Sequence, residues 1–273
     1  MFVLKLEERR IFRFDTGKQI PFSLPMEFYK FIGKVIMRCI IVLLALFSFC
    51  SNATTKESFI EKGQFRYVLY SGVDDTIVEQ INHKLTSKGP QLLADFKVQE
   101  IPTITIRIWK DRNQYLAYQK HLLGQSYPWS TGYISENEIL LRDTGSKSTM
   151  DTAYHEYVHL VTTAINPNII NNPRWLWEAI ACYEAEKEYG WRKPATREEF
   201  REYAKILKEG NGWDSQGSVY RIGYSIGEFI QQSYGSDGLI TLIRTNGDIS
   251  KVTDKPLDKV FDEWIEFTES KHY

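Results

Sequence analysis

The chain has 273 residues, of which 42% are hydrophobic and 25% are charged, and its formal net charge is −1. Such a chain can build one sizeable core, with room for a small second lobe. Acidic and basic residues are interspersed, so no basic stripe indicates a nucleic-acid partner and no acidic tail indicates a solvating segment.

The N-terminal segment carries the pattern of a secretory signal peptide. Residues 39–49, CIIVLLALFSF, form an apolar run that is shorter than the roughly 20 residues of a membrane-spanning helix. Arg38 precedes this run, and small residues ending at Ala53 follow it. A basic start, an apolar middle and a small-residue end are typical of a signal peptide, here residues 37–53.

The position of this signal suggests that translation starts at Met37. Counted from Met1, the segment before the apolar run would contain four acidic residues, whereas from Met37 it is short and basic. We therefore expect residues 1–36 to be a mis-assigned extension and residues 54–273 to be exported to the periplasm, the cell envelope or the medium. A real extension with a membrane anchor is the alternative. Cleavage after Ala53 leaves Cys182 as the only cysteine, which excludes an intrachain disulfide.

The first half of the exported segment mixes strand and helix signals. Ile104, Ile106 and Ile108 alternate with polar residues, which predicts a strand with one buried face. The expected strands are 65–70, 103–108 and two short strands around a polar turn within 131–142. The expected helices are 75–97, possibly broken near Gly89-Pro90, and 111–121. From Ser148 onward the pattern is helical, and this order predicts an α+β domain.

The segment HEYVH places His155, Glu156 and His159 on a helix that we expect to begin at Ser148 as its N-cap. Successive helical residues are about 100° apart, so His159 falls about 40° from His155. An apolar stripe faces the core on another side of this helix. Two imidazoles one turn apart can bind one cation, and His-Glu-x-x-His predicts two zinc ligands with Glu156 as general base. The alternative is a chance pair of surface histidines.

Glu178 is the candidate for a third ligand. It lies in the apolar segment RWLWEAIACYE, which we expect to form a helix with Pro173 as its first residue. A glutamate bordered by tryptophans is costly unless it is paired or binds a metal. Small residues share its side of the helix and would allow close approach to the first helix: Ala181, Cys182 and Ala185. The alternative is an exposed or salt-bridged Glu178, and Glu184 and Glu186 are weaker candidates.

HEYVH, an interval of 18 residues and Glu178 within RWLWEAIACYE resemble the gluzincin branch of the HExxH metallopeptidases. The closer resemblance is to the bacterial peptidase MA-like domains, with the pattern HE-x-x-H…WLxEG-x-A-x-Y, and the zinc core is also similar to that of M1 aminopeptidases. Ala179 departs from the glycine that the family usually has. The resemblance covers roughly residues 60–270. It implies a zincin-like fold, in which a small mixed sheet with an antiparallel edge strand packs on the HExxH helix, followed by a helical half.

The resemblance also implies a peptide-binding edge strand and a donor for the oxyanion of the reaction. Residues 133–142 are the candidate edge segment. SVYRIGYSIGEFIQQSYG is expected to be a helix ending at Gly235, with Gly223 and Gly227 in a close helix contact. Its Tyr220 and Tyr224 are the candidate donors. Tyr224 fits the family pattern Y-x-x-G/A-x-x-F better, and the alternative is that both tyrosines only pack.

Together these features predict an exported zinc metallopeptidase that acts on a peptide or protein substrate. His155, His159 and Glu178 bind zinc, a water molecule takes the fourth position, and Glu156 accepts its proton. One alternative is a catalytically silent zinc-binding envelope domain that binds extended peptide, and another is a helical structural protein without metal. The intact Glu156 favours the enzyme, because a silent domain does not need a base.

Overall fold

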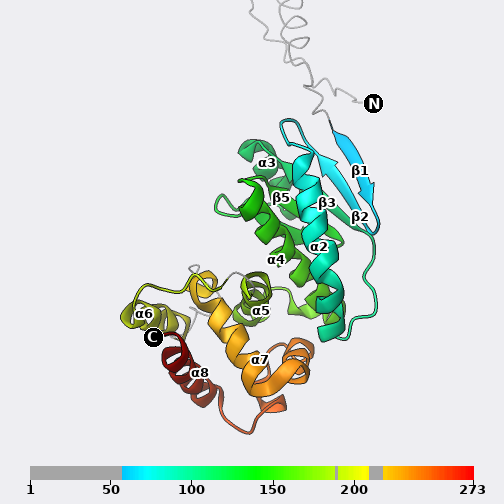
Figure 1. Ribbon diagram of the computed structural model, residues 1–273. Coiled ribbons are helices and arrows are strands. Elements are labelled where there is room, and N and C mark those ends of the chain that lie inside the picture. Colours follow the sequence, from blue (N-terminus) through cyan, green and yellow to red (C-terminus); the bar gives the residue numbers. More distant parts are fainter. Residues whose placement is uncertain (1–56, 188–189, 209–217) are drawn as a thin grey trace, which may run out of the picture. The chain divides into compact units, whose positions relative to one another are not determined.

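A five-stranded mixed sheet forms the first part of the chain that the structure describes (Figure 1). The computed structural model describes residues 57–187, 190–208 and 218–273, so the expected signal peptide at 37–53 lies outside the described residues. The strands are β1 (Ser58–Lys62), β2 (Phe65–Leu69), β3 (Ile104–Trp109), β4 (Gly132–Ser135) and β5 (Glu138–Arg142). They lie in the order β1-β2-β3-β5-β4, with β1–β2 and β4–β5 antiparallel and the other pairs parallel.

Helices cover both faces of this sheet. The alternating isoleucines of β3 face a core that contains residues of α2 (Thr76–Asp95) and α4 (Ser146–Ile165). On the opposite face, Trp109 and Leu140 pack with Tyr115 of α3 (Arg112–Leu123). Because successive side chains of a strand point to opposite faces, the sheet has an apolar layer on each face. The helix that carries HEYVH, α4, lies against the sheet.

The helical second half consists of α5 (Arg174–Glu186), α6 (Arg197–Lys208), α7 (Ser218–Arg244) and α8 (Leu257–His272). The expected α+β class, with a small mixed sheet followed by a helical C-terminal half, is confirmed. Gly235, with φ of 67°, breaks α7 where the sequence predicted a helix end. Among the described residues, no helix combines the length and the apolar character that crossing a bilayer requires.

Several boundaries differ from the sequence predictions. β1 was not predicted, because its residues are exposed or half-buried and show no apolar alternation. α2 runs without a break through Pro90, where Gly89 packs on the Tyr157 ring of α4. The helix of HEYVH begins at Ser146 rather than after Ser148. The helix of Glu178 begins one residue after Pro173, which is its N-cap.

The edge strand that the sequence predicted within residues 133–142 is shorter in the structure. Of the two strands in the predicted edge segment 133–142, only β4 lies at an edge of the sheet, because β5 is hydrogen-bonded to β3 on one side and to β4 on the other. The edge strand is therefore limited to residues 132–135. This edge strand contacts α4, so it lies beside the helix that carries the histidines.

Glycines on α7 allow α7 to pack closely on α5, as their spacing predicted. A Cβ on Gly223 would lie 3.2 Å from the Cα of Ala179, which is a tight contact. A Cβ on Gly227 would overlap the Cβ of Tyr183 and lie 2.9 Å from the carbonyl oxygen of Ala179. The contact of α5 with α7 therefore depends on the absence of a side chain at Gly227.

We expect Gly227→Ala to lower the free energy of unfolding by about 1–2 kcal/mol, because overpacking costs more than the alanine helix propensity returns. Gly223→Ala, its matched control, should change stability by less than about 1 kcal/mol, since its neighbour needs to yield only slightly. Urea unfolding followed by circular dichroism measures both values. Equal effects at the two positions would contradict this account of the contact.

Candidate metal centre

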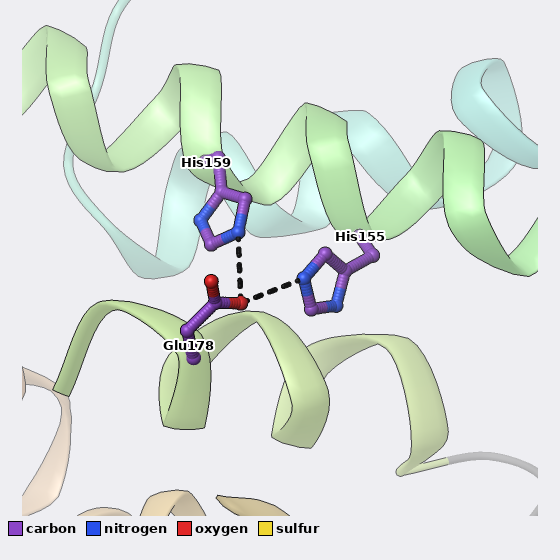
Figure 2. A group of neighbouring side chains, drawn as sticks. All are labelled: His155, His159 and Glu178. Atoms are coloured by element: carbon purple, nitrogen blue, oxygen red, sulfur yellow. Dashed lines mark hydrogen bonds and ion pairs between the residues drawn. The ribbon is translucent and has the colours of Figure 1, made fainter. Parts of the chain in front are cut away.

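Three potential metal ligands from two helices face one another (Figure 2). His155 and His159 extend from α4, and Glu178 extends from α5. The Oε2 atom of Glu178 lies 3.2 Å from Nε2 of His155 and 3.4 Å from Nε2 of His159. The structure thus brings together the three residues that the sequence proposed as ligands, with one donor atom of each within 4.8 Å of the others.

This spacing fits a cation with tetrahedral coordination. Donor atoms at the ligand distances of zinc are about 3.4 Å apart at the corners of a tetrahedron. The two separations from Glu178 Oε2 match that value. Two imidazoles and one carboxylate are also a donor set that borderline-soft divalent cations accept. The group could therefore hold a metal ion.

The charges in this group depend on burial and on mutual hydrogen bonds. Burial lowers the pKa of His159 to about 4, which favours its neutral imidazole. Burial alone would raise the pKa of Glu178, but hydrogen bonds with both histidines outweigh it and lower this pKa, which keeps the carboxylate ionised. Burial lowers the pKa of His155, yet its contacts with Cys182 and Glu178 prevail and raise this pKa.

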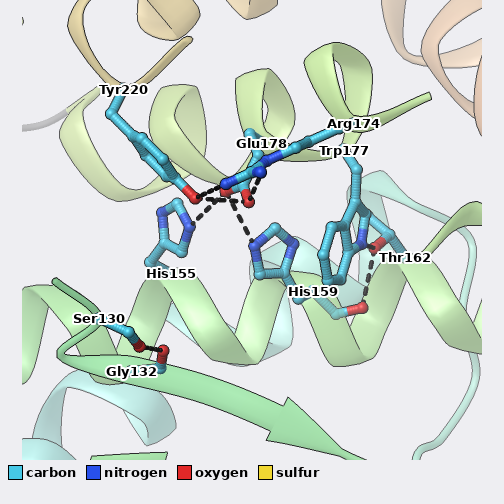
Figure 3. A network of polar contacts seen from close by, with 9 residues as sticks. All are labelled: Ser130, Gly132, His155, His159, Thr162, Arg174, Trp177, Glu178 and Tyr220. Carbon is cyan, nitrogen blue, oxygen red and sulfur yellow. Dashed lines mark hydrogen bonds and ion pairs between the residues drawn. The ribbon is translucent and has the colours of Figure 1, made fainter. Parts of the chain in front are cut away.

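A second layer of side chains orients the ligands (Figure 3). Trp177 stacks on the His159 ring at 3.7 Å between centroids and donates its Nε1–H to Thr162 Oγ1 at 3.1 Å. On the other side, Tyr220 donates its hydroxyl to Glu178 Oε1 at 2.8 Å. Oε1 is therefore engaged by a neutral donor, while Oε2 faces the two histidines.

Arg174 completes this layer. Its Nη2 donates to the Tyr220 hydroxyl at 3.1 Å, and its Nε lies 3.8 Å from Glu178 Oε1. Neither Arg174 nor Trp177 was predicted from the sequence to be a site residue. Arg174 could have been found, because it precedes Glu178 by four residues and so shares its side of the helix. Trp177 could not be distinguished from the other apolar residues of its segment.

Glu156 lies in the same cavity without belonging to the three ligands. The cavity of about 840 Å³ is lined by residues that include the three ligands, Glu156, Gly132 and Tyr220. Burial raises the pKa of Glu156 to about 8. A Cβ on Gly132 would overlap Thr152 Cγ2 and Glu156 Oε1, so the backbone of β4 lies directly on this carboxyl group. The absence of a side chain at Gly132 allows this close approach.

Of the two tyrosines, the structure brings Tyr220 to the site and leaves Tyr224 outside it. The Tyr224 hydroxyl donates to Glu228 Oε1 at 3.3 Å, and its ring stacks on Trp191. Tyr224 is not among the residues that line the cavity. The structure therefore places Tyr220, and not the preferred Tyr224, beside Glu178, because one helical turn moves a residue by about 5.4 Å along the axis and the first turn of α7 is the one beside Glu178.

No protein-family model matches the chain, and the search of curated proteins found no significant match. The residues of the cavity, their distances and their charges are therefore the basis on which a function can be assigned.

Proposed function

We propose that the chain is an exported zinc metallopeptidase of the gluzincin type, with a zincin-like arrangement of its sheet edge and HEYVH helix. The observation that supports this most strongly is the position of Glu178. Its Oε2 lies at tetrahedral spacing from two histidines on another helix. The signal-peptide pattern of residues 37–53 supports export.

His155, His159 and Glu178 would hold the ion. Zinc bound by three protein ligands polarises a water molecule and a carbonyl oxygen, and lowers the pKa of the water toward about 7. A peptidase needs in addition a base close to the ligands. Glu156 lies on the same helix as both histidines and lines the same cavity, so it is the candidate, and the positive charge of a bound ion would favour the ionised carboxylate that the role requires.

Glu156 accepts a proton as the water oxygen bonds to the peptide carbonyl carbon, and it passes this proton to the amine nitrogen as the C–N bond breaks. The carbonyl oxygen gains negative charge in this step and requires a hydrogen-bond donor. Tyr220 presents a hydroxyl in the cavity beside Glu178, and 36% of its surface is exposed, so it is the candidate donor. Arg174 would hold this hydroxyl between turnovers.

Metal content is the first test. We expect about one zinc per chain in purified protein, removable by chelators, because a catalytic zinc site usually has three protein ligands. His155→Ala and Glu178→Ala should lose most of the metal in elemental analysis. His83→Ala, which removes an exposed histidine of α2, should retain it. Full zinc retention in Glu178→Ala would exclude this residue as a ligand.

Glu156→Gln tests the base. The substitution preserves the shape of the side chain and removes its ability to accept a proton, so it should retain zinc while hydrolysis of a mixed peptide pool falls by about 10²- to 10⁴-fold. Glu184→Gln is the control, since Glu184 is equally buried but is paired with Lys187 and does not line the cavity. A wild-type protein that binds zinc and peptide but cleaves none of the pool would instead be a silent peptide-binding domain.

Tyr220→Phe and Tyr224→Phe form a matched pair that tests the oxyanion donor. Each change removes one hydroxyl from α7, and only Tyr220 faces Glu178. Tyr220→Phe should lower kcat by about 10²- to 10³-fold with little change in KM, as expected for the loss of one oxyanion donor. Tyr224→Phe should stay close to wild type. The reverse order, measured at equal zinc content, would remove Tyr220 from the mechanism.

A further inference from the structure

A large aromatic side chain stands exposed at the metal cavity. Trp129 lines this cavity, and 63% of its surface is exposed. Its ring centroid lies 5.9 Å from that of Tyr127 and 6.2 Å from that of Tyr220. Three aromatic rings therefore form one wall beside the ligands, here called the aromatic wall: Tyr127, Trp129 and Tyr220.

The backbone on both sides of Trp129 is held by side chains of α3. Gln119, which is fully buried, accepts the Tyr127 N–H at 2.6 Å. Buried Ser130 pairs with the Tyr115 hydroxyl at 2.9 Å. The loop is therefore held on both sides of Trp129 by hydrogen bonds to buried residues, while the indole itself is exposed to solvent. Because the loop is already ordered, less conformational entropy is lost when the indole binds a partner.

The charge beside the wall restricts what can bind there. The guanidinium of Arg174 lies 5.8 Å from the centroids of both Trp129 and Tyr220. A cationic guest on the indole would be repelled by this charge. Arg174 already interacts with Glu178 and Tyr220, so an acidic guest would compete with those contacts. An uncharged aromatic ring, stacked on the exposed indole, satisfies both restrictions.

We infer that the aromatic wall is a binding subsite for an aromatic side chain of the peptide substrate. This rests on the proposed peptidase function and adds a substrate class to it. The rings of Trp129 and His155 each lie within 6.5 Å of the Tyr220 ring, so they are at most about 13 Å apart. An extended peptide covers that distance in about four residues, which limits the aromatic residue to about four positions from the cleaved bond.

The test compares two peptides that differ only by Phe or Ala at one position, scanned along the chain of a cleaved sequence. For the zinc-loaded full chain, kcat/KM should be at least about tenfold higher for the Phe peptide at one position near the cleaved bond. Trp129→Ala should reduce this ratio to near one, and Trp129→Phe should retain most of it. Phe59→Ala removes an equally exposed aromatic residue from β1, outside the cavity, and should leave the ratio unchanged.

A binding measurement separates this inference from the proposed catalysis. The same peptides are titrated by calorimetry into zinc-loaded Glu156→Gln, which does not need to turn over. The Phe peptide should bind at least about tenfold more tightly than the Ala peptide, and Trp129→Ala in this background should remove the difference. If the wild-type protein hydrolyses none of the peptides while this binding preference is present, the proposed peptidase activity is refuted and the proposed subsite is retained. The proposed subsite would be overturned if the two peptides bind equally or if the preference for Phe survives Trp129→Ala. It would also be overturned if peptides with Lys or Glu at the same position bind more tightly than the Phe peptide.

Discussion

The position of Glu178 depends on how closely α5 packs between α4 and α7. Most residues of α5 are buried, and both α4 and α7 contact it. Ala179, next to Glu178, has Gly223 and Gly227 of α7 against its backbone. Because this contact leaves no space for larger side chains, the axis of α5 is held where Glu178 Oε2 reaches both histidines. Metal coordination would tolerate little displacement of the ligand atoms, so the proposed metal centre depends on this helix packing.

A buried carboxylate is costly unless donors surround it. Glu178 meets this requirement through the histidines at Oε2 and the Tyr220 hydroxyl at Oε1, with the Arg174 guanidinium nearby. Glu156 lies in the same cavity, and burial dominates its environment and raises its pKa to about 8. The two carboxyl groups thus differ in proton affinity because their surroundings differ, which is the usual physical basis for assigning different roles to neighbouring acids.

One short segment connects Glu156 with the aromatic wall. Ser130 lies between Trp129 at the cavity wall and Gly132 on Glu156, and its hydroxyl bonds to the carbonyl oxygen of Gly132 at 2.6 Å. Tyr115 and Gln119 of α3 support this segment from the other face of the sheet. The layer behind the sheet therefore contributes to the cavity although none of its residues are ligands. Such support from a rigid element positions binding residues more accurately than a free loop does.

Features that depend on spacing within one element could be predicted from the sequence. The helical register of His155 and His159, the alternation in β3 and the break at Gly235 are local, because backbone geometry alone relates neighbouring residues. Glu178 could be proposed because its apolar surroundings made an unpaired carboxylate costly. Tertiary structure decided what depends on how elements cross: Tyr220 rather than Tyr224 beside Glu178, the hydrogen bond from Arg174 to Tyr220, Trp177 on His159, and Gly132 on Glu156. Those contacts join segments far apart in the chain, and hydrophobic periodicity defines the buried side of a helix without defining which turn meets which partner.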